Sequence, residues 1–254
     1  MKNDLLNKIL SVTVTLLLIP VAHSAISLDR TRVVFPGGEK SVSLSVNNQN
    51  KSLPYLAQGW IEDMNGSKLE AGGPLTLLPP VQRIEPGGKS QVKIQATPGL
   101  NLLPQDKETL FYLNLREIPP KSNKPNTLQI ALQTRIKLFY RPDALARAAV
   151  NQQSAPFEEK LTLSKSGDTY TVNNPTPYYI TLIDASASSG GETVKGFETM
   201  MVSPKGSAIL GGKASELGAN PVLVYVNDYG GRPSLTFNCA GGQCKVDESK
   251  RNKK

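Results

Sequence analysis

The residues best suited to chemistry are two cysteines, Cys239 and Cys244, which lie together in NCAGGQC with a Gly-Gly pair between them. In an oxidising compartment this spacing predicts a disulfide across a tight hairpin. Because so short a loop restricts the unfolded chain little, we expect it to stabilise the fold by only about 1–2 kcal/mol. A metal site would need further soft ligands, and the single histidine, His23, lies in an N-terminal segment that we expect to be removed. The sequence predicts neither a metal site nor a cofactor.

Catalytic residue patterns are missing after residue 24. That part of the chain has no histidine for a hydrolase triad, no HExxH motif and no glycine-rich phosphate loop, and its two cysteines are expected to be paired. A Ser-Lys pair is conceivable on composition, but no feature of the sequence singles one out. We therefore expect a protein that is not an enzyme.

The first 24 residues predict export. Lys2 and Lys8 precede the apolar run ILSVTVTLLLIPVA, and Ala22-His23-Ser24 places small residues at the third and first positions before a cut. This pattern is typical of a cleaved signal peptide, with Ala25 as the first mature residue. A membrane anchor is the alternative, but the apolar run is too short to span a bilayer comfortably and no second run follows. We expect an exported protein without membrane insertion.

Length and charge narrow the class of partner. About 230 residues remain after the cut, which suits two domains of roughly 110 residues each. Those residues include 27 basic and 20 acidic side chains, a net charge of +7 compared with +8 for the whole chain. This charge could steer an acidic partner. Nucleic acid is not expected, because the chain is exported and its basic residues are scattered along strands without interleaved aromatic residues.

Short alternating runs, broken by Gly, Pro and Asn, indicate β-strands throughout the mature chain. They predict two antiparallel β-sandwiches of immunoglobulin size, over residues 25–142 and 151–246. Between them DALARAAV, at 143–150, is interpreted as a linker with a turn or two of helix. Residues 247–254 are interpreted as a basic, disordered tail.

One alternating run, TLQIALQTRIKLFYRP from residue 127, is longer than a small sandwich needs. Its apolar positions predict an extended strand with one apolar face, and its polar positions form the other face. The apolar positions are Leu128, Ile130, Leu132, Ile136, Leu138 and Tyr140, and the polar ones are Gln129, Gln133, Arg135 and Lys137. In an isolated sandwich the simplest interpretation is that the apolar row fills its own core.

Seven stretches of the chain resemble the PapD-like family of periplasmic pilus chaperones. They are SLDRTR, LPYLAQ followed by WIE, PPVQRIEPGGKS, LFYLNLREIPP, LQIALQTRIKLFYRP, NPTPYYITL and VNDYGGRP. The resemblance runs from about Ala25 to Val246. It implies a boomerang of two immunoglobulin-like domains that binds pilus subunits lacking their final strand and delivers them to an outer-membrane usher.

The resemblance also implies roles for individual residues. Three groups are matched: Leu128, Ile130 and Leu132 as the side chains donated to a subunit; Arg32 and Lys137 as cations that bind its terminal carboxylate; and Glu108, Arg141 and Asp228 as a charge network between the domains. Simple alternation puts Lys137 on the face opposite Ile130, and we expect a twist or bulge between them.

Another class of protein has the same architecture: a structural pilus subunit or a secreted adhesive module. A subunit should polymerise and lack a strand in its own sandwich, whereas a chaperone should be soluble alone and form one-to-one complexes. The sequence leaves open whether the free chaperone caps its exposed strand by forming a homodimer.

Overall fold

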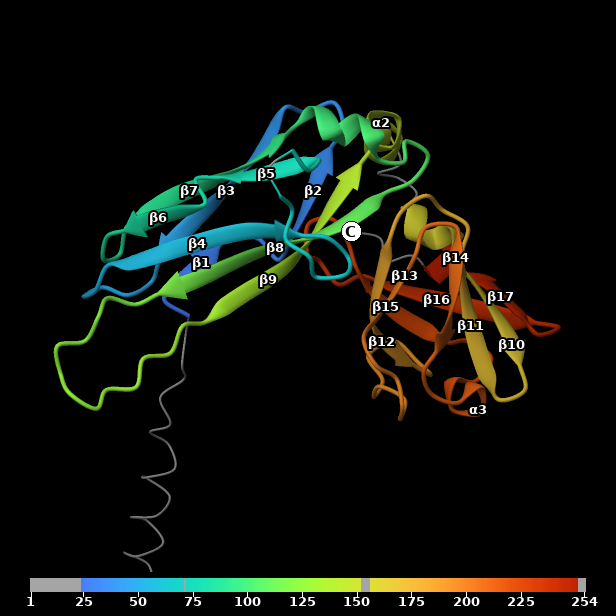
Figure 1. The fold of residues 1–254 in the computed structure, drawn as a ribbon. Helices are drawn as coiled ribbons and strands as arrows, with labels where there is room; N and C mark the ends of the chain where they lie inside the picture. The colour runs from blue at the N-terminus through green and yellow to red at the C-terminus, as the bar shows by residue number, and fades with distance from the viewer. Residues whose placement is uncertain (1–23, 71, 152–155, 251–254) are drawn as a thin grey trace, which may run out of the picture.

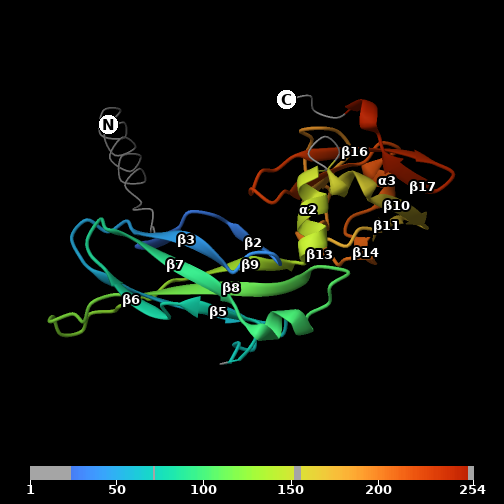
Figure 2. The same ribbon diagram turned by 90° about the horizontal axis from the view of Figure 1, so that it is seen from above.

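The structure, a computed structural model, describes residues 24–70, 72–151 and 156–250. They form two β-sandwich domains set at an angle, with a short helix at the corner (Figure 1). Viewed from above, the second domain lies toward one end of the first (Figure 2). The two predicted sandwiches are confirmed. The predicted signal peptide, except for Ser24, and residues 251–254 of the predicted tail lie outside the described residues.

The first domain packs a four-stranded sheet, in the order β1-β3-β7-β5, against a five-stranded sheet, β2-β9-β8-β4-β6. Its strands are β1 Ile26–Leu28, β2 Arg32–Pro36, β3 Ser41–Asn48, β4 Tyr55–Glu62, β5 Leu75–Leu78, β6 Val81–Ile84, β7 Lys89–Ala96, β8 Thr109–Ile118 and β9 Gln133–Arg141, with a 3-10 helix η1 at Pro98–Leu102.

The alternating sequence explains how these two sheets close on each other. In β3 the three serines of SVSLSVNN are at least partly exposed, whereas Leu44 and Val46, which alternate with them, are fully buried. Leu113 of β8 and Leu138 of β9 are buried with them in one core. A period of two therefore gives each sheet one apolar face, and burial of the two faces together stabilises the sandwich.

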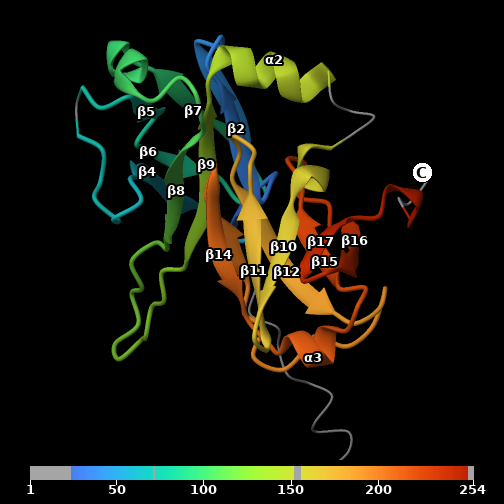
Figure 3. The same ribbon diagram turned by 90° about the vertical axis from the view of Figure 1, so that its right-hand side faces the viewer.

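The second domain contains one hydrogen-bonded sheet in the order β13-β12-β15-β16-β17-β10-β11-β14. Strand β16 joins its two halves by pairing with β15 and with β17, and apolar side chains from both halves share one core. Its elements are η2 Phe157–Lys160, β10 Thr162–Ser166, β11 Thr169–Asn174, β12 Ile180–Ser186, β13 Met200–Val202, β14 Gly206–Leu210, α3 Ala214–Leu217, β15 Val222–Val226, β16 Ser234–Ala240, β17 Gln243–Val246 and η3 Glu248–Lys250. The short helix α3 lies at the opposite end of this domain from the corner helix (Figure 3).

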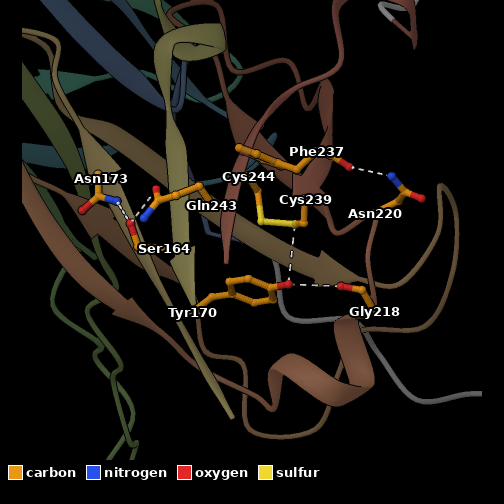
Figure 4. Close-up of a disulfide and its surroundings, with 9 residues drawn as sticks. All are labelled: Ser164, Tyr170, Asn173, Gly218, Asn220, Phe237, Cys239, Gln243 and Cys244. Atoms are coloured by element: carbon orange, nitrogen blue, oxygen red, sulfur yellow. Dashed lines mark hydrogen bonds between the residues drawn. A yellow bond between two sulfur atoms is a disulfide. The ribbon is translucent and has the colours of Figure 1, made fainter. Parts of the chain in front are cut away.

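The predicted disulfide is confirmed. Cys239 and Cys244 are register partners in the β16–β17 hairpin, and their sulfur atoms are bonded (Figure 4). The turn between them uses Gly241 and Gly242, whose φ angles of 57° and 82° favour glycine. The Tyr170 hydroxyl lies 3.5 Å from the Cys239 sulfur, so the bond packs against the domain and not only against its own hairpin.

The corner helix, α2, covers Asp143–Asn151, the segment predicted to carry a turn or two of helix between the domains. The Tyr178 hydroxyl of the second domain donates a hydrogen bond to the Leu145 carbonyl at 2.9 Å. Leu145 also packs against the second core. The helix is thus tied to the second domain.

The C-terminal tail differs from the prediction of disorder from residue 247. Residues 248–250 form η3, because the Asp247 carboxylate accepts hydrogen bonds from the Ser249 amide at 3.1 Å and from its hydroxyl at 2.6 Å. Such side-chain caps order a short turn locally.

Candidate functional site

The alternating run from residue 127 is a strand only from Gln133 onward, which corrects the prediction of one long strand. The ladder between β8 and β9 runs from Thr109 opposite Tyr140 to Arg116 opposite Gln133. One more bond follows, from the Glu117 amide to the Leu132 carbonyl at 2.9 Å. Beyond it β8 ends before Pro119-Pro120, which lacks amide donors. Residues 127–132 therefore extend past the sheet without a partner strand in the described chain (Figure 1).

The three apolar side chains of this extension are exposed. Leu128, Ile130 and Leu132 have exposed fractions of 85%, 65% and 40%. In β9, Ile136 and Leu138 have the same parity but are 8% and 0% exposed. The row that fills the core within β9 thus continues outside the core, and the interpretation that all of it fills its own sandwich is wrong. Unpaired backbone beside exposed apolar side chains can add to the sheet of another protein.

The two predicted cations, Arg32 and Lys137, lie side by side, although they are far apart in sequence. Strand β2 pairs with β9 in parallel, and the register places Arg32 directly opposite Lys137. Both side chains point toward the second domain. Arg32 Nη1 donates to the Val226 carbonyl at 2.8 Å, and Lys137 Nζ donates to the Thr181 hydroxyl at 3.0 Å.

Arg32 is buried and Lys137 is half-buried, which makes this pair of cations unusual. Among the described residues, no carboxylate oxygen lies within 4.0 Å of a charged nitrogen of either side chain. Burial, together with the charge of Arg32, lowers the pKa of Lys137 to about 8. Burial also lowers the pKa of Arg32, although the charges of Asp228, Glu158 and Glu108 oppose that shift.

Arg32 also has an unused donor. Its Nε is buried and has no hydrogen-bond partner in the described part of the chain. Buried donors are normally satisfied, and an ionised acceptor gives the strongest bonds to them. Two adjacent cations with a spare donor therefore form a site suited to a carboxylate.

The third group of predicted residues is also brought together, at the junction of the domains. Arg141 Nε donates to Glu108 Oε1 at 2.7 Å, and its two terminal nitrogens donate to both oxygens of Asp228 at 2.7 and 2.9 Å. Glu108 and Arg141 are buried, whereas the Asp228 side chain is about one-third exposed. Burial opposes the charge of Arg141, but its bonds to Asp228 and the charge of Glu108 outweigh that and raise its pKa.

This network links the two domains through backbone as well. Glu108 belongs to the first domain, and its Oε2 accepts a hydrogen bond from the Tyr179 amide of the second at 2.7 Å. The Glu108 amide in turn donates to the Pro177 carbonyl at 2.9 Å. The junction is therefore a set of directional bonds, which restricts the angle between the domains.

Part of the segment expected to hold a twist or bulge, between Ile130 and Lys137, lies in regular strand pairing. The registers of β9 with β2 and with β8 run without a shift, so no bulge separates Gln133 from Lys137. Lys137 and Phe139 contact the second domain: Lys137 bonds to Thr181, and the Phe139 ring lies 5.9 Å from the Tyr179 ring. Within β9, Lys137 therefore lies on the face opposite Ile136 and Leu138, whereas Ile130 lies before the start of this ladder.

Sequence reasoning missed two residues near the cations. Thr181 lies within the alternating run YYITLID and is one of several threonines in strands, so nothing in its sequence context marks it. Glu158 is buried beside the network, and burial raises its pKa to about 7, with a further contribution from the charge of Asp228. Both become evident only when the domains are placed together.

Among the residues that the structure describes, no group of His, Cys, Asp or Glu side chains could hold a metal ion. No helix in the described ranges is long and apolar enough to cross a membrane.

Comparison with known proteins shows which proteins this chain is similar to. Residues 25–146 match the model of the N-terminal domain of PapD, described as a pili and flagellar-assembly chaperone, and residues 156–237 match the model of its C-terminal domain. The chain is 49% identical over 249 residues to the probable fimbrial chaperone YfcS of Escherichia coli K12, covering 97% of this chain and 96% of that protein. It is also 49% identical over 243 residues to the chaperone protein PapD of Escherichia coli, covering 96% and 98%.

Solved structures agree with these matches. The periplasmic chaperone SfaE superposes with a TM-score of 0.62 and 29% identity, covering 83% of this chain and 98% of that one. The complex of the Salmonella enterica SafA pilin with the SafB chaperone gives 0.67 and 26%, covering 87% and 99%. The predicted pair of immunoglobulin-like domains in a boomerang arrangement is confirmed.

Proposed function

The chain belongs to the PapD family of pili-assembly chaperones, and from this premise we propose that it captures fimbrial subunits by lending them residues 128–132 as a strand. It is a chaperone of fimbrial assembly and not an enzyme. The observation that carries the proposal is the exposure of Leu128, Ile130 and Leu132 on a segment without a partner strand in the described chain.

Lending a strand satisfies two needs of an incomplete subunit at once. Its open sheet edge would offer unpaired backbone groups, and its sheets would leave an apolar groove between them. An extended segment bonds to the edge through its backbone and fills the groove with alternate side chains. Each side chain that is fully buried contributes about 1.5–3 kcal/mol, so the three contribute about 5–9 kcal/mol before ordering costs. Covering the edge would also prevent aggregation of the subunit.

The cations Arg32 and Lys137 would bind the terminal carboxylate of the subunit. Their side-by-side register, their burial and the unused Arg32 Nε support this role. Charge-assisted bonds from two fixed donors to one carboxylate are stronger than neutral hydrogen bonds where water is excluded.

The network of Glu108, Arg141 and Asp228 would hold the two domains at the angle that opens the cation site to a subunit. Desolvation offsets much of the Coulomb energy of a buried ion pair, so we assign the network to geometry more than to stability.

The remaining steps extend beyond this chain. The chaperone would act in the periplasm after cleavage of residues 1–24 and would pass its subunit to an outer-membrane usher. The SafA–SafB complex, in which a pilin is bound by its chaperone, supports the subunit as the partner. A free molecule would cap residues 128–132 by pairing with a second copy. The alternative of a pilus subunit or adhesive module is disfavoured, because these relatives are chaperones over nearly their full length.

The test is to purify the chaperone from periplasm with and without a co-expressed fimbrial subunit. Size-exclusion chromatography should give a one-to-one complex with the subunit. Arg32→Ala and Lys137→Ala should each abolish that complex while the fold stays intact, because the carboxylate loses a counter-charge from which water is largely excluded. Complexes of normal yield with both variants would remove the carboxylate site from the model.

A further inference from the structure

The two cations meet a matching pair of groups on the second domain. Arg32 and Lys137 are register partners in β2 and β9, and Thr181 and Val226 are register partners in β12 and β15. Arg32 donates to Val226, and Lys137 donates to Thr181. The pair of cations in the first domain thus faces a pair of acceptors in the second, and each cation donates one hydrogen bond to one acceptor.

The two acceptors differ in kind. The Val226 oxygen belongs to the backbone of a strand, so its place is fixed by the sheet. The Thr181 oxygen belongs to a side chain, and that side chain is 3% exposed. Thr181 is therefore the one member of the facing pair whose contribution to Lys137 can be removed by substitution without altering the backbone.

Lys137 needs such an acceptor. Its long stem is flexible, and it stands beside a second positive charge, Arg32, which repels it. The other charges near the pair, those of Asp228, Glu158 and Glu108, act on Arg32. Without a fixed acceptor, the ammonium would gain hydration and separation from Arg32 by turning toward water.

We infer that Thr181 is a positioning residue: its hydroxyl holds the Lys137 ammonium beside Arg32, so that both cations reach one carboxylate. This inference rests on the proposed carboxylate site. It assigns the second domain a direct part in capture, because that domain then supplies the group that orients the lysine.

The test compares Thr181→Val, Thr181→Ala and Thr181→Ser. Val keeps the volume of Thr without its hydroxyl, Ser keeps the hydroxyl with less volume, and Ala keeps neither. If Thr181 positions Lys137, the Val and Ala variants should bind a carboxylate weakly, and the Ser variant should bind it as the wild type does. If Thr181 only fills space, the Ala and Ser variants should bind a carboxylate weakly, and the Val variant should bind it as the wild type does.

Two readouts follow Lys137 directly. The first is the pKa of its amine, measured by NMR titration of its ε-carbon in the free protein. Removing an acceptor from the charged form lowers this pKa, so Val and Ala should titrate below the wild type and Ser close to it. The second readout is the affinity for a synthetic peptide of alternating Val and Thr residues. The affinity for the peptide with a free terminal carboxylate is compared with that for the same peptide with an amidated end. Val and Ala should weaken carboxylate binding about tenfold at pH 7.

Each result decides between hypotheses. A normal Lys137 pKa and normal peptide binding in Thr181→Val and Thr181→Ala would overturn the inference and leave the carboxylate site standing. Equal binding of the free and amidated peptides to the wild type would overturn the carboxylate site, and the inference with it. Melting of each variant shows that the second domain is folded, and Thr181→Ala decides the matter if Thr181→Val does not fold.

Discussion

Substitution of Ile130 by Glu tests the donated strand most directly. In the free chaperone this side chain is 65% exposed, so the new carboxylate remains in water. Exposed substitutions usually change stability by less than about 0.5 kcal/mol, which shifts the melting temperature by at most a few degrees. In a complex with a subunit, the same position would lie in an apolar groove. Losing the isoleucine costs about 1.5–3 kcal/mol, and an unpaired buried carboxylate costs several more.

Even about 4 kcal/mol of this cost corresponds to roughly a thousandfold loss of affinity, so capture should fail. Two controls fix the interpretation. Gln129→Glu adds the same charge to the neighbouring exposed residue of opposite parity, and it should capture subunits normally. Ile136→Glu places the charge at a position of the same parity that is 8% exposed, and it should unfold the first domain. Capture and melting are measured on the same preparation of each variant. Capture by Ile130→Glu equal to that by Gln129→Glu would refute the donor assignment, and unfolding of Ile130→Glu would place the residue in the core.

Three further predictions follow from the described contacts. Because the pKa of Lys137 is lowered to about 8, subunit capture should hold below pH 8 and decline as the pH rises through it. The free protein should instead gain stability from about pH 8 to about pH 10.5, because in this range the unfolded chain binds the lysine proton more tightly than the folded chain does. Titrating capture and melting between pH 6.5 and 10.5 checks both signs. Lys137→Arg should remove the decline of capture and the gain in stability above about pH 8, whereas the titration of Glu158, whose pKa is about 7, remains. A thiol count on unfolded, unreduced protein should find no free thiol, since Cys239 and Cys244 are bonded, and two free thiols would disprove the disulfide. Finally, the buried Glu117 carboxylate accepts the Ile26 amide at 2.9 Å, so cleavage before Ala25 would place the new terminal ammonium beside it. Glu117→Gln should then destabilise the mature protein by about 1–3 kcal/mol, and an unchanged melting curve, or a mature chain that starts elsewhere by mass spectrometry, would contradict this.

The alternating runs were enough to predict two sandwiches, because burial on one face of a strand leaves a period of two in the sequence. They could not predict where β9 begins. The residues on both sides of Gln133 alternate alike, and alternation reports which face is apolar, not whether a partner strand exists. The start of β9 depends instead on the Pro119-Pro120 end of β8, which removes the partner.

The candidate site shows the same limit. The resemblance matched Arg32 and Lys137 to a shared role, but only the parallel pairing of β2 with β9 makes them neighbours. Pairing between strands so distant in sequence has no periodic signature. Thr181 was missed for a related reason: its partner lies in another domain, and the contact depends on the angle between the two.

The separation of the cations from the apolar row has a consequence for register. A strand added beside residues 128–132 keeps its alternation after a slip of two residues, so the apolar row alone cannot tell these registers apart. A slip of two residues moves the added strand by about 6.6 Å. A carboxylate bound by Lys137 in one register would then lie beyond hydrogen-bond reach of both cations in the next. The exposed row would therefore supply affinity for any complementary groove, while the cations would select one register.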